Sequence, residues 1–249
     1  MRIFIVYANP EPNSLGAAMR DRSVEVLRAE GHEVVVSDLY AMQFDPVARG
    51  DDFQERRFPD RLQYDREQKH AVREGAFAPD IRQEIDRLFW CDHLILQFPL
   101  WWWSVPAILK GWIDRVFVNG LVYGAGLRLE HGGLKPRSAM LAFTTGCYPE
   151  MAGPGGLLGN MEASLWHLHS GTFHYAGLSV LPPFIGWRVR YSDGDPREAT
   201  LDAYAAHLRA MPEAKPYAFH ISSDVGADWT LREDVAPINA AYAREGWRL

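Results

Sequence analysis

Apolar and polar residues form alternating blocks along the chain that predict strands and helices in turn. The first block, residues 3–8 (IFIVYA), is apolar or aromatic throughout, which is typical of a strand buried on both faces. A helical pattern follows, which Asn13 or Ser14 can cap and which Gly31 ends. Further strand patterns cover 32–36, 92–98, 139–144 and 178–181, and helical patterns cover 81–89, 107–117, 158–168 and, after a capping box at 195–198, the segment to 211. This alternation predicts an α/β fold with a doubly wound five-stranded parallel sheet.

Two long stretches depart from the alternation. Residues 41–80 are polar and show no periodicity, and an excursion of this length inside a compact domain usually covers a ligand or contacts a partner subunit. Residues 212–249 are mixed and carry several aromatic side chains. We therefore expect one domain over residues 1–211 and a C-terminal extension over 212–249, packed on the same domain or on a dimer partner.

The most informative segment joins a strand to a helix through three consecutive tryptophans, Trp101, Trp102 and Trp103. Open α/β sheets bind ligands at the carboxyl ends of their strands, and an aromatic shelf there suggests a flat, conjugated ligand such as a flavin. Packing in the core or in a dimer interface is the alternative. Because consecutive side chains point in different directions, we expect only one or two of the rings to contact the ligand. Ser104 and Pro106 are expected to begin the following helix.

Composition narrows the class of protein. The 249 residues are 47% hydrophobic and 23% charged, as in an ordinary globular domain, and the net charge of −6 offers no basic field for nucleic acid. Two cysteines, Cys91 and Cys147, are too few for a disulfide framework and indicate a reducing compartment. The N-terminus runs straight into a strand pattern, and no apolar run approaches the ~20 residues that span a bilayer. These features predict a cytoplasmic protein without membrane insertion.

Phosphate and metal motifs give weaker signals. Neither GxGxxG nor GxxxxGK[ST] occurs, so the candidate phosphate site is the turn at residues 9–14, ahead of a helix N-terminus; a simple capped loop is the alternative. His167, His169 and His174 are close in sequence, but a spacing of two does not place side chains on one helix face, so we expect no metal site. Cys147 lacks the partners of a catalytic nucleophile and is expected to line the site.

Taken together, the motifs resemble those of the NAD(P)H:quinone oxidoreductases of DT-diaphorase type, which are flavodoxin-like flavoproteins. The matching segments fall in order over residues 1–211: 9–14, 38–42, 79–81, 97–100, 105–112, 115–117, 144–146 and 170–171. The resemblance implies a homodimer with one FAD per subunit, in a site that both chains complete. It also implies a ping-pong reaction, in which NADH or NADPH gives a hydride to the flavin and a quinone then replaces it.

The resemblance also implies roles for individual residues. The implied cofactor-binding residues are Asn9, Ser14, Leu15, Gln63, Pro99, Leu100, Trp101, Trp102, Trp103, Thr144, Thr145, Gly146, Cys147 and Arg197. Gln63 would lie near the adenine and Arg197 near the outer face of the cofactor. The substrate pocket would be shaped by Trp103, Tyr123, Tyr148 and Tyr175, with Tyr123 and Tyr175 supplied by the partner chain.

One departure from the family concerns a Tyr and a His that stabilise negative charge on the reduced flavin. Counting forward from Thr144 without gaps, Ala152 and Leu158 occupy these positions. Losing the pair should slow or retune hydride transfer without abolishing it, since that chemistry belongs to the cofactor. Tyr148, in the same loop, is the candidate catalytic side chain. Leu158 also fits the apolar face of the following helical pattern.

Two other functions stay open at this point. One is an FMN-dependent azo- or nitroreductase of the same fold, although the excursion containing Gln63 favours the larger FAD. The other is a regulatory flavoprotein subunit of a potassium-efflux system, in which turnover is secondary. The missing Tyr/His pair keeps this second alternative open.

Overall fold

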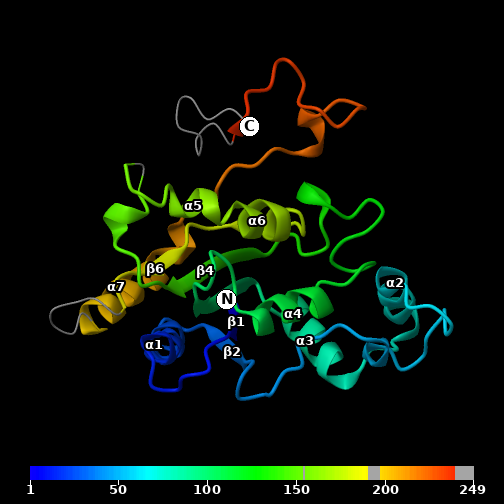
Figure 1. Cartoon of the computed structure of the whole chain (residues 1–249), viewed down its shortest axis with the longest axis horizontal. Coiled ribbons are helices and arrows are strands. Elements are labelled where there is room, and N and C mark those ends of the chain that lie inside the picture. The colour runs from blue at the N-terminus through cyan, green and yellow to red at the C-terminus, as the bar shows by residue number, and fades with distance from the viewer. Residues whose placement is uncertain (154, 190–196, 239–249) are drawn as a thin grey trace.

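The computed structural model describes residues 1–153, 155–189 and 197–238 and contains a parallel β-sheet between two layers of helices (Figure 1). Its strands are β1 (Arg2–Tyr7), β2 (Glu33–Asp38), β3 (His93–Pro99), β4 (Ser138–Thr144), β5 (Ser179–Val180) and β6 (Phe184–Gly186). The strand order is β2-β1-β3-β4-β5, with β6 also paired to β4, and every pairing is parallel. This is the flavodoxin-like order, so the predicted fold class is confirmed.

The prediction of five strands differs from the structure at the sheet edge. The position of a single fifth strand is shared by two short strands: β5 pairs with Ser138 and Ala139, and β6 pairs with residues 142–144 of β4. Pro182 and Pro183 separate them. Because proline has no N–H to donate, the ladder is interrupted there and resumes further along β4.

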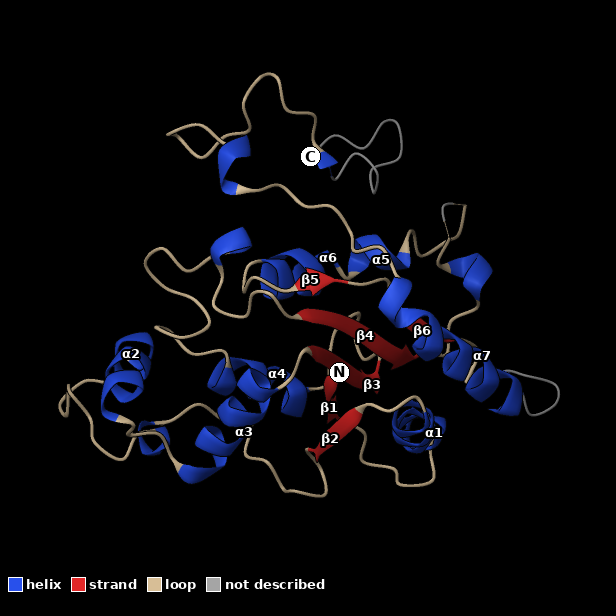
Figure 2. Ribbon diagram, turned by 180° about the vertical axis from the view of Figure 1, so that it is seen from behind, coloured by secondary structure: helices blue, strands red, loops and turns tan. Residues whose placement is uncertain are grey.

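Helices cover both faces of the sheet (Figure 2). They are α1 (Leu15–Ala29), α2 (Tyr64–Glu74), α3 (Pro79–Trp90), α4 (Ala107–Val116), α5 (Met161–Ser164), α6 (Trp166–Leu168) and α7 (Arg197–Ala210). Alternate residues of β1 enter opposite cores: Ile3 and Ile5 pack with α1 and α7, whereas Phe4 and Val6 pack with α3 and α4. None of the helices within the described ranges is both long and apolar enough to cross a membrane.

The helix α1 confirms the predicted capping. Ser14 accepts a hydrogen bond from the N–H of Ala17 at 3.1 Å, and Gly31 follows the helix with φ of 78°. The predicted cap of α4 is wrong. Pro106 occupies its N-cap position without a side-chain hydrogen bond, and Ser104 instead contacts His167.

Residues 41–80 contain a helix that the hydrophobic pattern did not predict. The helix α2 buries only Glu67, Gln68 and Ala71, so its inward face is mostly polar. The loop before it is held against α4 by a buried ion pair of 2.8 Å between Arg115 and Asp52. At Gly111 of α4, a Cβ atom would lie 2.1 Å from the carbonyl oxygen of Pro46, so only glycine permits this approach.

The segment after β4 folds as several short helices, where the pattern predicted one. Met161, Leu165 and Leu168 are buried as predicted, but Leu158 is half-buried in a turn that precedes α5. A π-helical segment, His169–His174, follows α6. Of the predicted capping box, Asp195 and Pro196 lie outside the described residues. Short 3-10 turns occur at Gly50–Asp52, Leu129–His131, Pro149–Met151, Met211–Glu213 and Ser222–Asp224.

After α7 the chain extends beyond α5 and α6 (the orange and red segment in Figure 1). Its first part packs on the domain. The N–H of Tyr217 donates to the carbonyl oxygen of Val180 at 2.9 Å, and the Phe219 ring stacks on His174 at 4.6 Å. Further out, the guanidinium of Arg128 lies over the Trp229 ring at 4.4 Å.

Candidate functional site

Three loops meet where β1, β3 and β4 end. In the ladder, Pro99 lies beside Thr144, and the N–H of Leu100 donates to the carbonyl oxygen of Thr144 at 2.8 Å. The N–H of Ala8, just after β1, donates to the carbonyl oxygen of Gln97 at 2.9 Å. The loops that follow these strands are therefore fixed side by side at the carboxyl edge of the sheet. This is where open α/β folds place their ligands.

The loop after β1 leads into the N-terminus of α1. Asn9 Oδ1 accepts the N–H of Glu11 at 3.0 Å, which tightens the turn. Ser14 uses its hydroxyl to cap Ala17, whereas the N–H groups of Leu15 and Gly16 belong to the first turn, where a helix has no acceptor for them. A Cβ at Gly16 would lie 3.0 Å from Asn9 Nδ2, so the small residue keeps this approach open. With the helix dipole, this arrangement suits a phosphate.

Packing between α1 and α7 brings Arg197 to the same loop. Arg22 of α1 pairs with Glu198 and Asp202 of α7 at 3.3 and 3.0 Å. At the start of α7, Arg197 Nη1 donates to the carbonyl oxygen of Asn13 at 3.3 Å. The structure thus places Arg197 next to the candidate phosphate loop, although the two segments are 184 residues apart in sequence.

The tryptophans form a two-residue reverse turn. Trp101 and Ser104 exchange backbone hydrogen bonds of 3.1 and 3.0 Å, and the central residues, Trp102 and Trp103, have φ of 49° and 59°. Two successive positive φ values are the mark of a type I′ turn, which favours Asn and Gly. Trp102 is 99% exposed and Trp101 44%, whereas Trp103 is half-buried against the core. Bulky rings held in a strained turn at this edge point to a binding role.

The loop after β4 presents backbone groups. Thr144 and Thr145 are almost fully buried, Gly146 is exposed and Cys147 is half-buried. The N–H of Thr145 donates to the carbonyl oxygen of Gly186 at 2.9 Å, and Cys147 accepts from the N–H of Arg188 at 3.1 Å. These hydrogen bonds to Gly186 and Arg188 fix the backbone of the loop after β4. The loop can therefore offer backbone donors and acceptors to a flat ring without side-chain rearrangement.

Of the other predicted residues, Gln63 and Tyr123 lie at α2, and Tyr175 neighbours Tyr123. Gln63 is the N-cap of α2, and the hydroxyl of Tyr123 donates to Gln68 Oε1 of α2 at 3.4 Å. Burial is the main cause that raises the pKa of Tyr123, and the neighbouring Asp65 and Tyr175 raise it further. The helix α2 lies at the opposite end of the molecule from α1 and α7 (Figures 1 and 2). The predicted residues therefore form two groups within one chain.

Comparison with known proteins shows the family of the chain. The family model for the flavodoxin-like fold matches residues 1–211. Over 223 residues the chain is 38% identical to NAD(P)H dehydrogenase [quinone] 1 of Cavia porcellus, covering 89% of this chain and 81% of that protein. It is 37% identical over 216 residues to ribosyldihydronicotinamide dehydrogenase [quinone] of Rattus norvegicus, covering 86% and 94%. The chain belongs to the flavodoxin-like quinone reductase family.

A solved structure extends this family likeness to nearly the whole chain. A protein from Klebsiella pneumoniae, assigned by its name to the quinone reductases, superposes with a TM-score of 0.90 at 34% identity. The match covers 95% of this chain and 96% of that one. The resemblance inferred from the sequence motifs is confirmed.

Two further positions lie between β4 and α5, where the resemblance and an ungapped count from Thr144 imply that the family's Tyr and His would fall. Ala152 is buried there and Leu158 is half-buried. Tyr148 is half-buried, and the guanidinium of Arg188 lies 4.7 Å from the centre of its ring. The structure thus gives Tyr148 a cationic neighbour that the sequence pattern did not indicate.

The three histidines near α6 go to separate places. His167 Nε2 lies 3.1 Å from Ser104 Oγ, so it contacts the tryptophan turn; the two residues are 63 positions apart and only the tertiary structure reveals the contact. His169 is fully buried, and burial lowers its pKa to about 4. His174 Nε2 bonds the carbonyl oxygen of His220 at 2.9 Å. Across residues 1–153, 155–189 and 197–238, no three potential metal ligands lie together.

Proposed function

We propose that this chain is an FAD-dependent NAD(P)H:quinone oxidoreductase that reduces quinones, or related electron-poor aromatics, by two electrons. The observation that supports it best is the meeting of three loops at the carboxyl edge, in a chain of the quinone reductase family. The loop after β1 offers N–H groups at the start of α1 that have no acceptor within the helix. The loop after β3 offers an aromatic turn, and the loop after β4 offers backbone donors and acceptors. These are the three kinds of surface that a phosphate-bearing, flat cofactor requires.

The residues present fit a flavin dinucleotide. The first-turn amides at Leu15 and Gly16, with Ser14 and Asn9 beside them, would hold phosphate, and Arg197 would add positive charge. Pro99, Leu100 and the backbone of the tryptophan turn would lie along one side of the ring. The loop of Thr144, Thr145, Gly146 and Cys147 would face its polar edge. When bound, the flavin supplies hydride acceptance from NADH or NADPH and electron delivery to the quinone.

A single substrate pocket explains the ping-pong order that we propose. Trp103 and Tyr148 would border the place where a second flat molecule lies over the ring. Because nicotinamide and quinone would use the same place, one must leave before the other enters. Tyr148 is the proposed catalytic side chain, and its position beside Arg188 would favour stabilising negative charge as the flavin is reduced.

We also propose a homodimer, which the position of the second group of predicted residues supports. Gln63 and Tyr123 lie at α2, Tyr175 neighbours Tyr123, and α2 lies at the opposite end of the molecule from α1 and α7 (Figures 1 and 2). In a two-fold dimer, the α2 end of one protomer can complete the site of the other. We also propose that residues 1–211 form the flavin-binding domain and 212–249 an extension of it, and that the protein is cytoplasmic, consistent with the unpaired Cys91 and Cys147.

The test begins with the purified protein and its visible spectrum. We expect a yellow protein that releases FAD on denaturation, elutes as a dimer and oxidises NADH or NADPH faster when menadione is added. Initial rates at several fixed menadione concentrations should give parallel double-reciprocal lines, as a ping-pong mechanism requires. A colourless protein that takes up neither FAD nor FMN would overturn the proposal.

Other outcomes would identify the alternatives. Release of FMN together with azo-dye or nitroaromatic turnover would assign the chain to that class of reductase. A yellow protein without turnover would favour a regulatory flavoprotein subunit, for which the apolar Ala152 and Leu158 are the supporting observation.

A further inference from the structure

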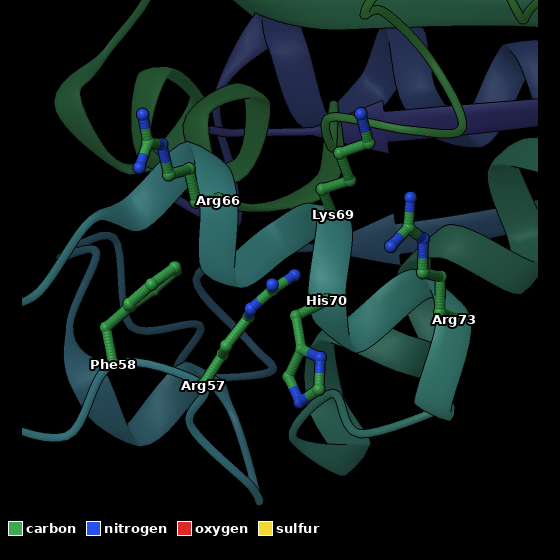
Figure 3. Close-up of a pocket in the computed structure, with 6 residues that line it drawn as sticks. All are labelled: Arg57, Phe58, Arg66, Lys69, His70 and Arg73. Atoms are coloured by element: carbon green, nitrogen blue, oxygen red, sulfur yellow. The ribbon is translucent and has the colours of Figure 1, made fainter.

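A second charged surface lies at the α2 end of the molecule. Five basic residues, named here the basic face, surround a hollow of about 280 Å³ together with Phe58 (Figure 3): Arg57, Arg66, Lys69, His70 and Arg73. Four of them belong to α2, and Arg57 belongs to the loop that precedes it. In Figure 3 the charged ends of Arg66, Lys69 and Arg73 extend to the same side of the helix.

The spacing of these residues concentrates positive charge. Arg66 lies three and four positions before Lys69 and His70, and Arg73 lies four and three positions after them, so each is a neighbour of the two central residues on the helix surface. Like charges at these intervals repel and destabilise the helix. A helix that keeps them is therefore explained better by a ligand than by its own stability.

Acidic residues do not neutralise this surface. Elsewhere in the chain basic residues pair with acids, as Arg2 does with Asp92 at 2.7 Å and Arg82 with Asp86 at 2.9 Å. Among the ion pairs of the described residues, none includes a member of the basic face. The exposed acids of α2, Asp65 and Glu74, flank it without pairing to it.

The third acid of α2, Glu67, holds the preceding loop against the helix. Its side chain is fully buried and accepts the backbone N–H groups of Arg57 and Phe58 at 2.8 and 2.9 Å. Arg56 lies 3.5 Å from the same carboxylate and donates to the carbonyl oxygen of Phe58 at 2.6 Å. The buried carboxylate of Glu67 thus fixes the position of the loop that carries Arg57, next to α2.

We propose that the basic face is a phosphate-binding site for a small phosphorylated ligand such as a nucleotide. Guanidinium groups match phosphate oxygens in charge and in planar geometry, and Arg57, Arg66 and Arg73 supply three of them. The hollow is slightly below the ~300–1,000 Å³ of drug-sized sites, which suits one or two phosphate groups. Phe58 adds an apolar surface for an attached ring. The basic face lies apart from the carboxyl edge of its own chain. In the proposed dimer α2 would border the partner's flavin site, so the test uses flavin-loaded protein, in which the flavin occupies its own phosphate site.

The test measures binding of inorganic pyrophosphate to the flavin-loaded protein by titration calorimetry at low and high salt. The variant R66Q/K69Q/R73Q removes three charges of the basic face. The matched control R82Q/K110Q/R209Q removes three exposed charges elsewhere, all of which are paired with acids. We expect pyrophosphate to bind the wild type and the control alike, more weakly at high salt, and the first variant at least about tenfold more weakly.

Pyrophosphate that fails to bind the wild type, or binds both variants equally, would overturn the site. Thermal unfolding of both variants verifies that they are folded. The conservative R66K/R73K variant, which keeps the positive charges, should bind pyrophosphate more tightly than R66Q/K69Q/R73Q. Kinetics then identify the source of the phosphate. A KM that rises for NADPH but not for NADH would assign the site to the adenosine phosphate of the hydride donor. Unchanged KM values with lost pyrophosphate binding would assign it to a separate phosphorylated ligand.

Discussion

The two ends of this molecule use charge in different ways. At the end formed by α1 and α7, exposed charges pair across helices, as Arg22 does with Asp202, and the candidate site itself presents backbone groups. At the α2 end, buried acids such as Asp52 and Glu67 hold an outlying segment in place. The cations of the basic face form no ion pair with any acid in the described part of the chain. A site made from backbone needs only correct helix and turn geometry. A site made from long side chains needs buried groups that position them.

The strongest test of this difference removes the buried ion pair that attaches the α2 end. In Arg115→Met, the side chain of Asp52, only 4% exposed, loses its cationic partner and keeps the hydrogen bonds from the hydroxyl of Tyr64 and the N–H of Arg49. We expect the free energy of unfolding in urea to fall by about 3–5 kcal/mol, because a buried charge is left uncompensated.

Lys110→Met on the same helix is the control, since its pair with Asp114 is exposed and should be worth less than ~1 kcal/mol. Equal losses in the two variants would show that the ion pair does not hold the α2 end.

A smaller effect is expected from Glu67→Gln, which keeps the shape of the side chain. Burial alone would raise the pKa of Glu67, but the N–H groups of Arg57 and Phe58 and the charge of Arg56 outweigh it and hold the pKa below its ordinary value. The variant should lose about 1.5–3 kcal/mol of unfolding free energy at pH 7, as for a hydrogen bond to a charged group.

The pH dependence sharpens this prediction. Since the folded-state pKa is depressed, the stabilisation by Glu67 is present above the ordinary value of 4.5 and is lost as the pH falls through the folded value. Urea unfolding of the wild type and of E67Q should therefore converge in acid. Glu74→Gln, exposed on the same helix, should leave stability unchanged, and a constant gap between wild type and E67Q at every pH would contradict the assignment.

The smallest effect belongs to the carboxyl edge. Ser14→Ala removes the cap of α1 and should lower the free energy of unfolding by about 1 kcal/mol. Ser14→Asp keeps a capping oxygen, so stability should be retained, but its negative charge would oppose a phosphate at the helix N-terminus. Flavin titration should then show weaker binding for S14D than for wild type, in spite of equal stability. Equal flavin affinity would remove α1 from the cofactor site.

Local signals explain most of what the sequence predicted. The apolar runs of β1, β3 and β4 and the Ser14 cap depend on neighbouring residues, so one segment suffices to recognise each of them. The helix α2 was missed because Glu67 and Gln68, which a hydrophobic pattern counts as exposed, occupy its inward face. The strand β6 was missed because three residues after two prolines give no pattern of their own, and the ladder with β4 stabilises them.

The positions of the segments that form the candidate site were predictable to a similar extent. The tryptophan turn and the loop after β4 follow apolar strands, and their place at the carboxyl edge follows from parallel topology. The position of Arg197 near Asn13 and the contact of His167 with Ser104 depend on helix packing between distant segments. The directions of the tryptophan side chains could not be predicted either, because the residue types do not indicate a backbone reversal with positive φ. This reversal leaves Trp103 half-buried and Trp102 fully exposed.

In the tryptophan turn, the backbone conformation does not require aromatic side chains. Asn and Gly adopt positive φ with far less strain than tryptophan, so an Asn-Gly pair at positions 102 and 103 would preserve the reversal and relax it. A selection for heat resistance alone would favour that exchange, at the expense of two aromatic surfaces beside the proposed cofactor. If the proposed cofactor binds here, the two tryptophans in this unfavourable conformation would exchange thermal stability for contact with the ligand.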